Sequence, residues 1–206
     1  MTPVVKNLII INALVWLALR VFNSFPLLLR LSLFPIDRTA SYNETIFRFN
    51  PYQLITHMFT HWDFTHLLFN MIGLYIFGTI LERVWGPKRF LTCYLLAGLG
   101  AAALHLLVLY LRGPEYFSFA MGASGAVMGL LAAFAYLFPN TPMLIFPIPV
   151  PIKAIYMALG YMAIDLFGGL GNFKGDRIAH FAHLGGAITG FILVLYWNKT
   201  NKRTLY

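Results

Sequence analysis

The chain has 206 residues, of which 59% are hydrophobic and 11% charged, with a net charge of +8. A soluble domain is usually about 45–50% apolar and about 25% charged, so this composition leaves too few polar residues to cover a soluble particle. It predicts an integral membrane protein and excludes disordered, collagen-like and disulfide-rich secreted chains. The one cysteine, Cys93, has no intramolecular partner. No basic stripe with interleaved aromatic residues appears, so we predict no nucleic-acid binding and attribute the positive charge to the flanks of membrane spans.

Six apolar stretches are candidate transmembrane helices, each of which needs about 20 mostly apolar residues. We predict an all-α membrane protein, a compact bundle of six transmembrane helices that forms a single domain over residues 1–206. The connections are short except for residues 23–53, where prolines and charged and apolar residues predict a structured interfacial loop. Residues 146–151 contain three prolines and cannot be helical throughout. The predicted spans are residues 8–22, 54–81, 90–111, 124–138, 152–167 and 178–197.

The distribution of basic residues predicts the orientation. The first span is expected to be retained, because no small-x-small cleavage site follows it. With six spans both termini lie on one side, which carries eight Lys and Arg residues. The other side carries three, once those in and beside the long first loop are set aside. We therefore expect cytoplasmic termini. Since no basic, Arg/Ser-rich leader is present, we expect a multi-pass protein of a bacterial cell (cytoplasmic) membrane.

Several polar residues lie inside the predicted spans, where such groups are costly and mark candidate sites. His66 and Asn70 are four residues apart and share a helix face. The spans with His66, Ser124 and His183 all run inward, and His66 and His183 lie about 18 and about 8 Å below their helix starts. Ser124 begins a span of about 15 residues, which is short for a core of about 30 Å. If the loop before Ser124 dips inward, the three groups meet in one outward-facing cavity.

His57 and His61 have a spacing that is compatible with a metal site. The sequence has no His-Glu-x-x-His motif and no cysteine pair, so we predict no metal centre. We interpret both histidines as hydrogen-bonding residues near the interface or the first loop. Nine residues separate His57 from His66, which places them on opposite faces of one helix.

Three other ionisable side chains in the spans are weaker candidates. His180 shares a face with His183 but lies nearer the expected mouth of the cavity. His105 is interpreted as a packing residue. Asp165 is interpreted first as a hydrogen-bond partner between helices, and only in second place as a catalytic carboxylate.

Small residues surround both Ser124 and His183. Gly122 and Gly125 leave the Ser124 hydroxyl accessible and let the backbone turn sharply, although a serine at a helix start is also an ordinary cap. Gly186 and Gly190 form a small-residue stripe that allows a close helix approach. That stripe begins three residues after His183, so it can bring this histidine close to another backbone.

Three motifs therefore follow one another along the chain. They are the run from His57 to Asn70, the Gly-Ala-Ser-Gly segment at 122–125, and the Ala-His-Leu-Gly-Gly segment at 182–186 followed by Gly190. In order, spacing and six-span layout they strongly resemble the rhomboid family of intramembrane serine proteases. The family has a His-x-x-x-Asn helix, a Gly-x-Ser-Gly nucleophile segment and an Ala-His-x-x-Gly helix. The resemblance covers about residues 50–197.

The resemblance implies a catalytic dyad without a carboxylate, in which Ser124 is the nucleophile and His183 the general base. It implies that His66, Asn70 and the Ser124 amide form an oxyanion hole. Substrates would be single-span membrane proteins with helix-destabilising residues near the outer membrane face, and the partners would be these substrates and the lipid bilayer. Residues 152–167, with the glycine-rich segment at 168–171, would form a lateral gate. No cofactor is implied, because the nucleophile is a side chain.

Two departures from the family pattern stand out. Many members carry Trp-Arg just before the second span, where this chain has Tyr52-Gln53, and this concerns the anchoring of the first loop. Many members carry an aromatic residue four positions after the serine, stacked on the catalytic histidine, where this chain has Met128. A thioether still packs on an imidazole, but it holds the ring less firmly.

Three other classes of membrane protein share some of these sequence features. A catalytically silent rhomboid-like membrane-protein binder typically lacks the serine or the histidine, and both are present here. A transporter or metal permease predicts histidines on one helix face and usually an inverted repeat, and neither is seen. A purely structural scaffold requires Ser124, His66, Asn70 and His183 to coincide by chance. We therefore predict an intramembrane serine endopeptidase.

Overall fold

The computed structural model describes residues 1–36, 48–113, 117–145, 148–171 and 179–200. Within these ranges the chain is almost entirely helical, which confirms the predicted all-α class apart from one two-stranded hairpin. In chain order the elements are α1 (Pro3–Val21), α2 (Phe25–Leu31), α3 (Gln53–Thr56), the 3-10 turn η2 (His57–Phe59), α4 (Phe64–Gly73), the π-helical turn η3 (Leu74–Gly78), α5 (Thr79–Arg112), α6 (Ser124–Leu137), β1 (Pro142–Ile145), β2 (Ile148–Lys153), α7 (Ala154–Gly171) and α8 (His180–Thr200).

A buried carboxylate holds the start of α1. Pro3 occupies the first turn, where a missing N–H costs nothing. Glu82 of α5 accepts hydrogen bonds from the backbone N–H groups of Val4 at 3.0 Å and Val5 at 2.9 Å. A negative charge thus meets the positive end of the helix dipole. Glu82 is buried, so this contact fixes the beginning of α1 against α5.

Gln53 anchors the first loop, at the position where the sequence departs from the family pattern. Its amide oxygen accepts from the backbone N–H groups of Phe34 and Asn50, and its amide nitrogen donates to the carbonyls of Arg30 and Arg48. The side chain is fully buried, and these four bonds use its polar atoms on both sides of the amide. Glutamine therefore supplies the anchoring that the departure had placed in question.

The second predicted span begins later than the sequence suggested. The expected helix over residues 54–81 is interrupted, because α3 and η2 end at Phe59 and α4 starts only at Phe64. Asp63 is extended and caps α4, its carboxylate accepting from the His66 N–H at 2.7 Å. The prediction that His57 and His66 lie on opposite faces of one helix, with His66 about 18 Å below its start, is therefore wrong. His66 lies in the first turn of α4.

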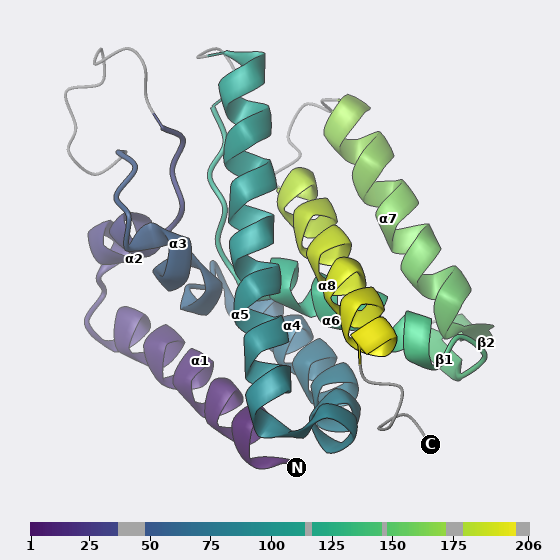
Figure 1. Cartoon of the computed structure of the whole chain (residues 1–206). Helices are drawn as coiled ribbons and strands as arrows, with labels where there is room; N and C mark the ends of the chain where they lie inside the picture. The colour runs from purple at the N-terminus through teal and green to yellow at the C-terminus, as the bar shows by residue number, and fades with distance from the viewer. Residues whose placement is uncertain (37–47, 114–116, 146–147, 172–178, 201–206) are drawn as a thin grey trace.

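A continuous helical stretch extends from Phe64 to Arg112 and changes direction once. The change occurs at Gly86, whose φ of 77° is in the left-handed region that glycine adopts without strain, and Pro87 follows it. The chain therefore passes through α4, η3 and the start of α5, turns at Gly86, and returns along the rest of α5. In Figure 1 this longer part of α5 is the tall helix at the centre of the molecule.

Helices α5, α6 and α8 pack most closely, because glycines face one another between them. A Cβ added at Gly186 of α8 would collide with the Gly125 carbonyl oxygen of α6, and one at Gly190 would collide with that of Gly129. Gly125 itself faces Ala101 of α5. The two small-residue stripes therefore bring the backbones of α6 and α8 into direct contact.

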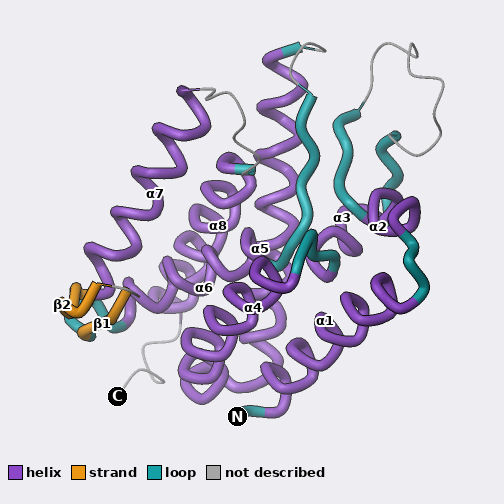
Figure 2. Tube along the Cα trace, turned by 180° about the vertical axis from the view of Figure 1, so that it is seen from behind, coloured by secondary structure: helices purple, strands orange, loops and turns teal. Residues whose placement is uncertain are grey.

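Helix α6 begins inside the molecule. The loop before it descends beside α5, as Figure 2 shows, and it pairs with the first loop through two backbone hydrogen bonds between Leu33 and Ala120, of 2.8 and 2.9 Å. This dipping loop explains why α6 has only 14 residues. From the end of α6 the antiparallel hairpin β1–β2 leads into α7, which lies beside α8 in both views (Figures 1 and 2).

The protein is a multi-pass membrane protein. Within the described residues, four helical segments are long and apolar enough to cross a bilayer, namely Pro3–Val21, Phe64–Arg112, Ala154–Gly171 and His180–Thr200, while Ser124–Leu137 is apolar but shorter. Large apolar side chains are exposed on these helices, as expected for surfaces in contact with lipid. The start of α1 and the end of α8 lie at the same end of the molecule (Figure 1). The count of six crossings stays a prediction.

Candidate active site

Ser124 is the first residue of α6 and lies at the end of a tightly held turn. Gly122 has a φ of 108°, which glycine adopts without strain. Its N–H donates to the carbonyl of His57 at 2.8 Å, and the Ala123 N–H points to Nε2 of His61 at 3.3 Å. The first N–H groups of a helix have no partner within the helix. The Ser124 hydroxyl and the first amides of α6 therefore face the same region.

The backbone carbonyl of His57 and the ring of His61 thus hold the turn that presents Ser124. Sequence reasoning missed this role. A histidine nitrogen accepts a hydrogen bond only while it is unprotonated. Burial lowers the pKa of His61 to about 3 and that of His57 to about 4, so both rings are neutral at physiological pH. The signal in the sequence was only that two histidines stood near the motif. Their contacts with the turn at Gly122 depend on the break between η2 and α4, which the sequence pattern did not reveal.

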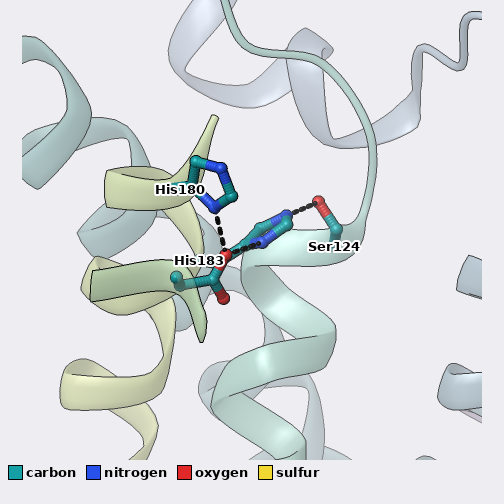
Figure 3. Close-up of polar contacts among 4 residues, drawn as sticks. Ser124, His180 and His183 are labelled. Atoms are coloured by element: carbon teal, nitrogen blue, oxygen red, sulfur yellow. Dashed lines mark hydrogen bonds and ion pairs between the residues drawn. The ribbon is translucent and has the colours of Figure 1, made fainter. Parts of the chain in front are cut away.

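His183 lies on α8 with its ring directed at Ser124. Its Nε2 is 2.8 Å from the Ser124 Oγ, within the distance range of a hydrogen bond. Figure 3 shows the ring pointing from α8 toward Ser124, with His180 on the side away from the serine. The close contact of α6 and α8 at Gly125 and Gly186 makes this distance reachable for side chains on two different helices.

A buried carboxylate contacts the other side of the His183 ring. Oδ1 of Asp165, on α7, lies 3.0 Å from Nδ1 of His183 and 2.7 Å from Nδ1 of His180. The side chains of Asp165 and His180 are each 8% exposed, and that of His183 is 16% exposed. Asp165 does form the predicted contact between helices, but its partners are the candidate base and the histidine one turn before it.

His66 and Asn70 line the space beside the turn at Gly122. A Cβ at Gly122 would lie 2.6 Å from Nε2 of His66 and 3.6 Å from Nδ2 of Asn70. One N–H of the Asn70 amide donates to the His66 carbonyl at 2.9 Å, and a primary amide has a second N–H to offer. The His66 ring and the Asn70 amide, both on α4, therefore lie beside the turn that leads into Ser124.

Met128 and His105 lie outside this group of contacts. Met128 is half-buried and packs against the main hydrophobic cluster of the bundle, and its effect on the His183 ring stays a prediction. His105 is buried on α5, and we assign it no role in the chemistry. Among the residues that the structure describes, no group of three His, Cys, Asp or Glu side chains is arranged to hold a metal ion.

The arrangement has the parts that acyl transfer requires. A hydroxyl is hydrogen-bonded to an imidazole, the imidazole is held from its far side, and two polar side chains of α4 lie beside the turn that precedes the serine. Ser124, His66 and His183 are partly exposed rather than sealed.

Comparison with known proteins agrees with this geometry. The Rhomboid domain family matches residues 48–199. The chain is 32% identical to the putative rhomboid protease YdcA of Bacillus subtilis over 196 residues, covering 93% of this chain and 86% of that protein. It is 32% identical to Rhomboid protein 1, mitochondrial, of Saccharomyces cerevisiae over 146 residues, covering 71% of this chain. It is 29% identical to the rhomboid protease AarA of Providencia stuartii over 183 residues, covering 77% of this chain.

The relatives differ in how much of their own length is matched. The chain spans 42% of the yeast protein and 63% of the Providencia protein, so only part of each of these two relatives is matched. The matched residues include α3 to α8, and with them Ser124, His183, His66 and Asn70. A family match over about three-quarters of the chain, together with the three motifs in order, places this protein in the rhomboid family.

Proposed function

We propose that this protein is an intramembrane serine endopeptidase that uses Ser124 as nucleophile and His183 as general base. The observation that carries the proposal is the 2.8 Å contact between Ser124 Oγ and His183 Nε2. A nucleophile and its base must lie within about 2.6–3.2 Å for proton transfer during attack. The family relatives that are named proteases, from Bacillus subtilis and Providencia stuartii, support the same assignment.

The reaction follows from this pair. The Ser124 oxygen attacks the carbonyl carbon of the scissile peptide while its proton moves to Nε2 of His183. The tetrahedral intermediate then collapses, and the same proton passes to the leaving amine. A water molecule, activated in the same way, releases the acyl group from Ser124. His183 accepts and returns one proton in each half of the reaction.

His66, Asn70 and the Ser124 amide would form the oxyanion hole. The carbonyl oxygen becomes negatively charged only in the tetrahedral state, so donors that are fixed in advance lower the barrier selectively. Gly122 supports this role because any side chain there would occupy the space next to His66 and Asn70. Removal of one such donor typically lowers kcat by about 10²–10³-fold.

The proposed substrates are single-span membrane proteins with helix-destabilising residues near the outer face of the membrane. A helical segment keeps its carbonyls hydrogen-bonded, so it must unwind before one can enter the site. Ser124 and His183 are half-buried. This supports cleavage at a depth of the enzyme that water reaches. We further propose that the protein lies in the cell (cytoplasmic) membrane with both termini in the cytoplasm. Its catalysis would need neither a metal ion nor another cofactor.

The test compares wild type, Ser124→Ala and His183→Ala, purified and reconstituted in liposomes with a single-span substrate whose outer half is rich in Gly and Ala. We expect cleavage by wild type and a loss of at least about 10³-fold in both variants. Equal cleavage by all three proteins would reveal a contaminating protease and contradict the proposal.

A fluorophosphonate probe on the same samples separates the enzyme from the catalytically silent rhomboid-like binder. Labelling of wild type but not of Ser124→Ala supports an activated serine even where the chosen substrate is not cleaved. An unlabelled, well-folded wild type would favour the silent binder of membrane proteins over the protease.

A further inference from the structure

The contact between Asp165 and two histidines goes beyond the proposed Ser–His pair. Asp165 is 5% exposed, and its Oδ1 lies 3.0 Å from Nδ1 of His183 and 2.7 Å from Nδ1 of His180. A carboxylate in such a place is costly unless it is hydrogen-bonded. Both of its ring partners come from α8 (Figure 3), whereas Asp165 itself belongs to α7.

We propose that Asp165 is a positioning carboxylate that acts through His183 and supports the Ser124–His183 pair from the far side of the imidazole ring. This inference rests on the proposed protease function and deepens it. Asp165 touches no reacting atom. It acts on the base through the ring nitrogen that faces away from the serine.

The chemistry follows from which ring nitrogen carries the proton. An ionised carboxylate only accepts hydrogen bonds, so a ring nitrogen 3.0 Å from Oδ1 must carry a hydrogen. With Nδ1 of His183 protonated, Nε2 has the lone pair that accepts the Ser124 proton. During attack the serine oxygen forms its bond to the carbonyl carbon, the carbonyl electron pair moves to oxygen, and Nε2 gains the proton. Asp165 keeps its charge throughout and stabilises the imidazolium that is formed.

His180 completes the support of the carboxylate. Its Nδ1 lies closer to the same Oδ1 atom than that of His183 does, so it fixes the oxygen that faces His183. A Cβ at Gly168 would lie 2.5 Å from the His180 ring, so the glycine lets this ring lie directly on the backbone of α7. Two ring donors on one carboxylate oxygen give the carboxylate a defined orientation.

A purely structural helix-to-helix bond would use the same contacts, so the test must change the charge and keep the shape. Asp165→Asn retains an oxygen that accepts from Nδ1–H and removes the negative charge. Glu82→Gln is a matched control, because Glu82 is also a buried carboxylate of a helix but holds the backbone of α1. Both variants are assayed in liposomes beside wild type and Ser124→Ala.

We expect Asp165→Asn to lower kcat by about 10²–10⁴-fold with little change in KM, since amide replacement of a triad carboxylate has effects of this order. Asp165→Glu should recover part of that loss, and Glu82→Gln should keep the kcat of wild type. If Asp165→Asn keeps wild-type kcat while Ser124→Ala is inactive, the inference falls and the protease stands. If Ser124→Ala is as active as wild type, the proposed function itself falls.

A second measurement reads the protonation of the His183 ring directly in the wild-type protein. NMR of wild type labelled with ¹⁵N-histidine, with the His183 signals assigned by their loss in His183→Ala, reports which ring nitrogen carries the proton. Protonated Nδ1 and unprotonated Nε2 support the inference. The opposite tautomer in a protein that reacts with a fluorophosphonate overturns it.

Discussion

At the residue scale, Asn70 offers a clean test of the oxyanion hole. Its amide donates one hydrogen bond to the His66 carbonyl and has a second N–H to offer near Gly122. We expect Asn70→Ala to reduce kcat by about 10²–10³-fold, because one donor to the developing charge is lost. Steady-state cleavage in liposomes measures the effect. Unchanged kcat in a folded variant would exclude Asn70 from the site.

Gly122 tests the shape of the same space. A methyl group at this position would come within 2.6 Å of the His66 ring, at a backbone φ of 108°. We expect Gly122→Ala to abolish substrate cleavage. Gly113→Ala is the matched control, because Gly113 also has a positive φ of 89° but no neighbour within 4 Å. Equal activity losses in the two variants would mean that backbone strain alone, and not contact with His66, causes the effect.

At the same scale, some site residues could be predicted and others could not. Ser124, His183, His66 and Asn70 stood in local motifs, and local patterns survive without knowledge of packing. The proximity of Asp165 to His183 depends on the rotation of α7 against α8, and neither helix has a strongly one-sided apolar pattern that would fix its rotation. A hydrogen bond from Asp165 to another helix could therefore be predicted, but the residue that makes it could not.

At the element scale, the contact of α6 with α8 governs the distance between nucleophile and base. A Cβ at Gly186 would collide with the backbone carbonyl of Gly125, and a backbone cannot rotate away as a side chain can. We expect Gly186→Ala to cost about 1–3 kcal/mol of stability and to reduce fluorophosphonate labelling of Ser124, because the helices must separate. Thermal unfolding and labelling rate are the two measurements.

Gly160→Ala is the control for that prediction. Gly160 lies on α7 with no atom within 4 Å of an added Cβ, so alanine there should be neutral or slightly stabilising, by about 0.4–1 kcal/mol. Retention of wild-type stability and labelling in Gly186→Ala would show that α6 and α8 tolerate separation. The importance of the glycine stripe would then be refuted.

Sequence patterns located the helices better than their boundaries. Apolar content alone marked the long helices, because a membrane-spanning segment needs a long apolar run, but it did not mark the short helix α2 within the predicted loop. The break between η2 and α4 was missed, since residues 60–63 contain neither Gly nor Pro. The one available signal was Asp63, a favoured helix-capping residue placed before an apolar run. A single polar residue does not outweigh the apolar pattern around it.

At the scale of the whole molecule, the orientation can be tested by cysteine labelling. The start of α1 and the end of α8 lie at one end of the molecule, and α1 runs from there toward α2 (Figure 1). We expect Lys6→Cys and Lys199→Cys to react with an impermeant maleimide from the cytoplasmic face only. Asn23→Cys, just after α1, should react from the opposite face.

The labelling background is favourable, because the native Cys93 is fully buried. Right-side-out and inside-out vesicles give the two faces separately, and the labelling is read by mass shift. Reaction of residues 6 and 199 from different faces would contradict an even number of crossings. Reaction of both from the outer face would reverse the predicted orientation while leaving the number of crossings even.

The three side chains that we propose to act together lie on three separate helices. Full activation of the serine would therefore depend on how these helices pack against one another. Ser124 belongs to α6, His183 to α8 and Asp165 to α7. Any outward displacement of α7 would withdraw the negative charge from the base while leaving the serine and histidine in contact. His183 would then have its carboxylate partner only while α7 is packed against α8. Because the two equilibria are coupled, a bound peptide that favours the contact between His183 and Asp165 must also favour the packed position of α7, by the same free energy.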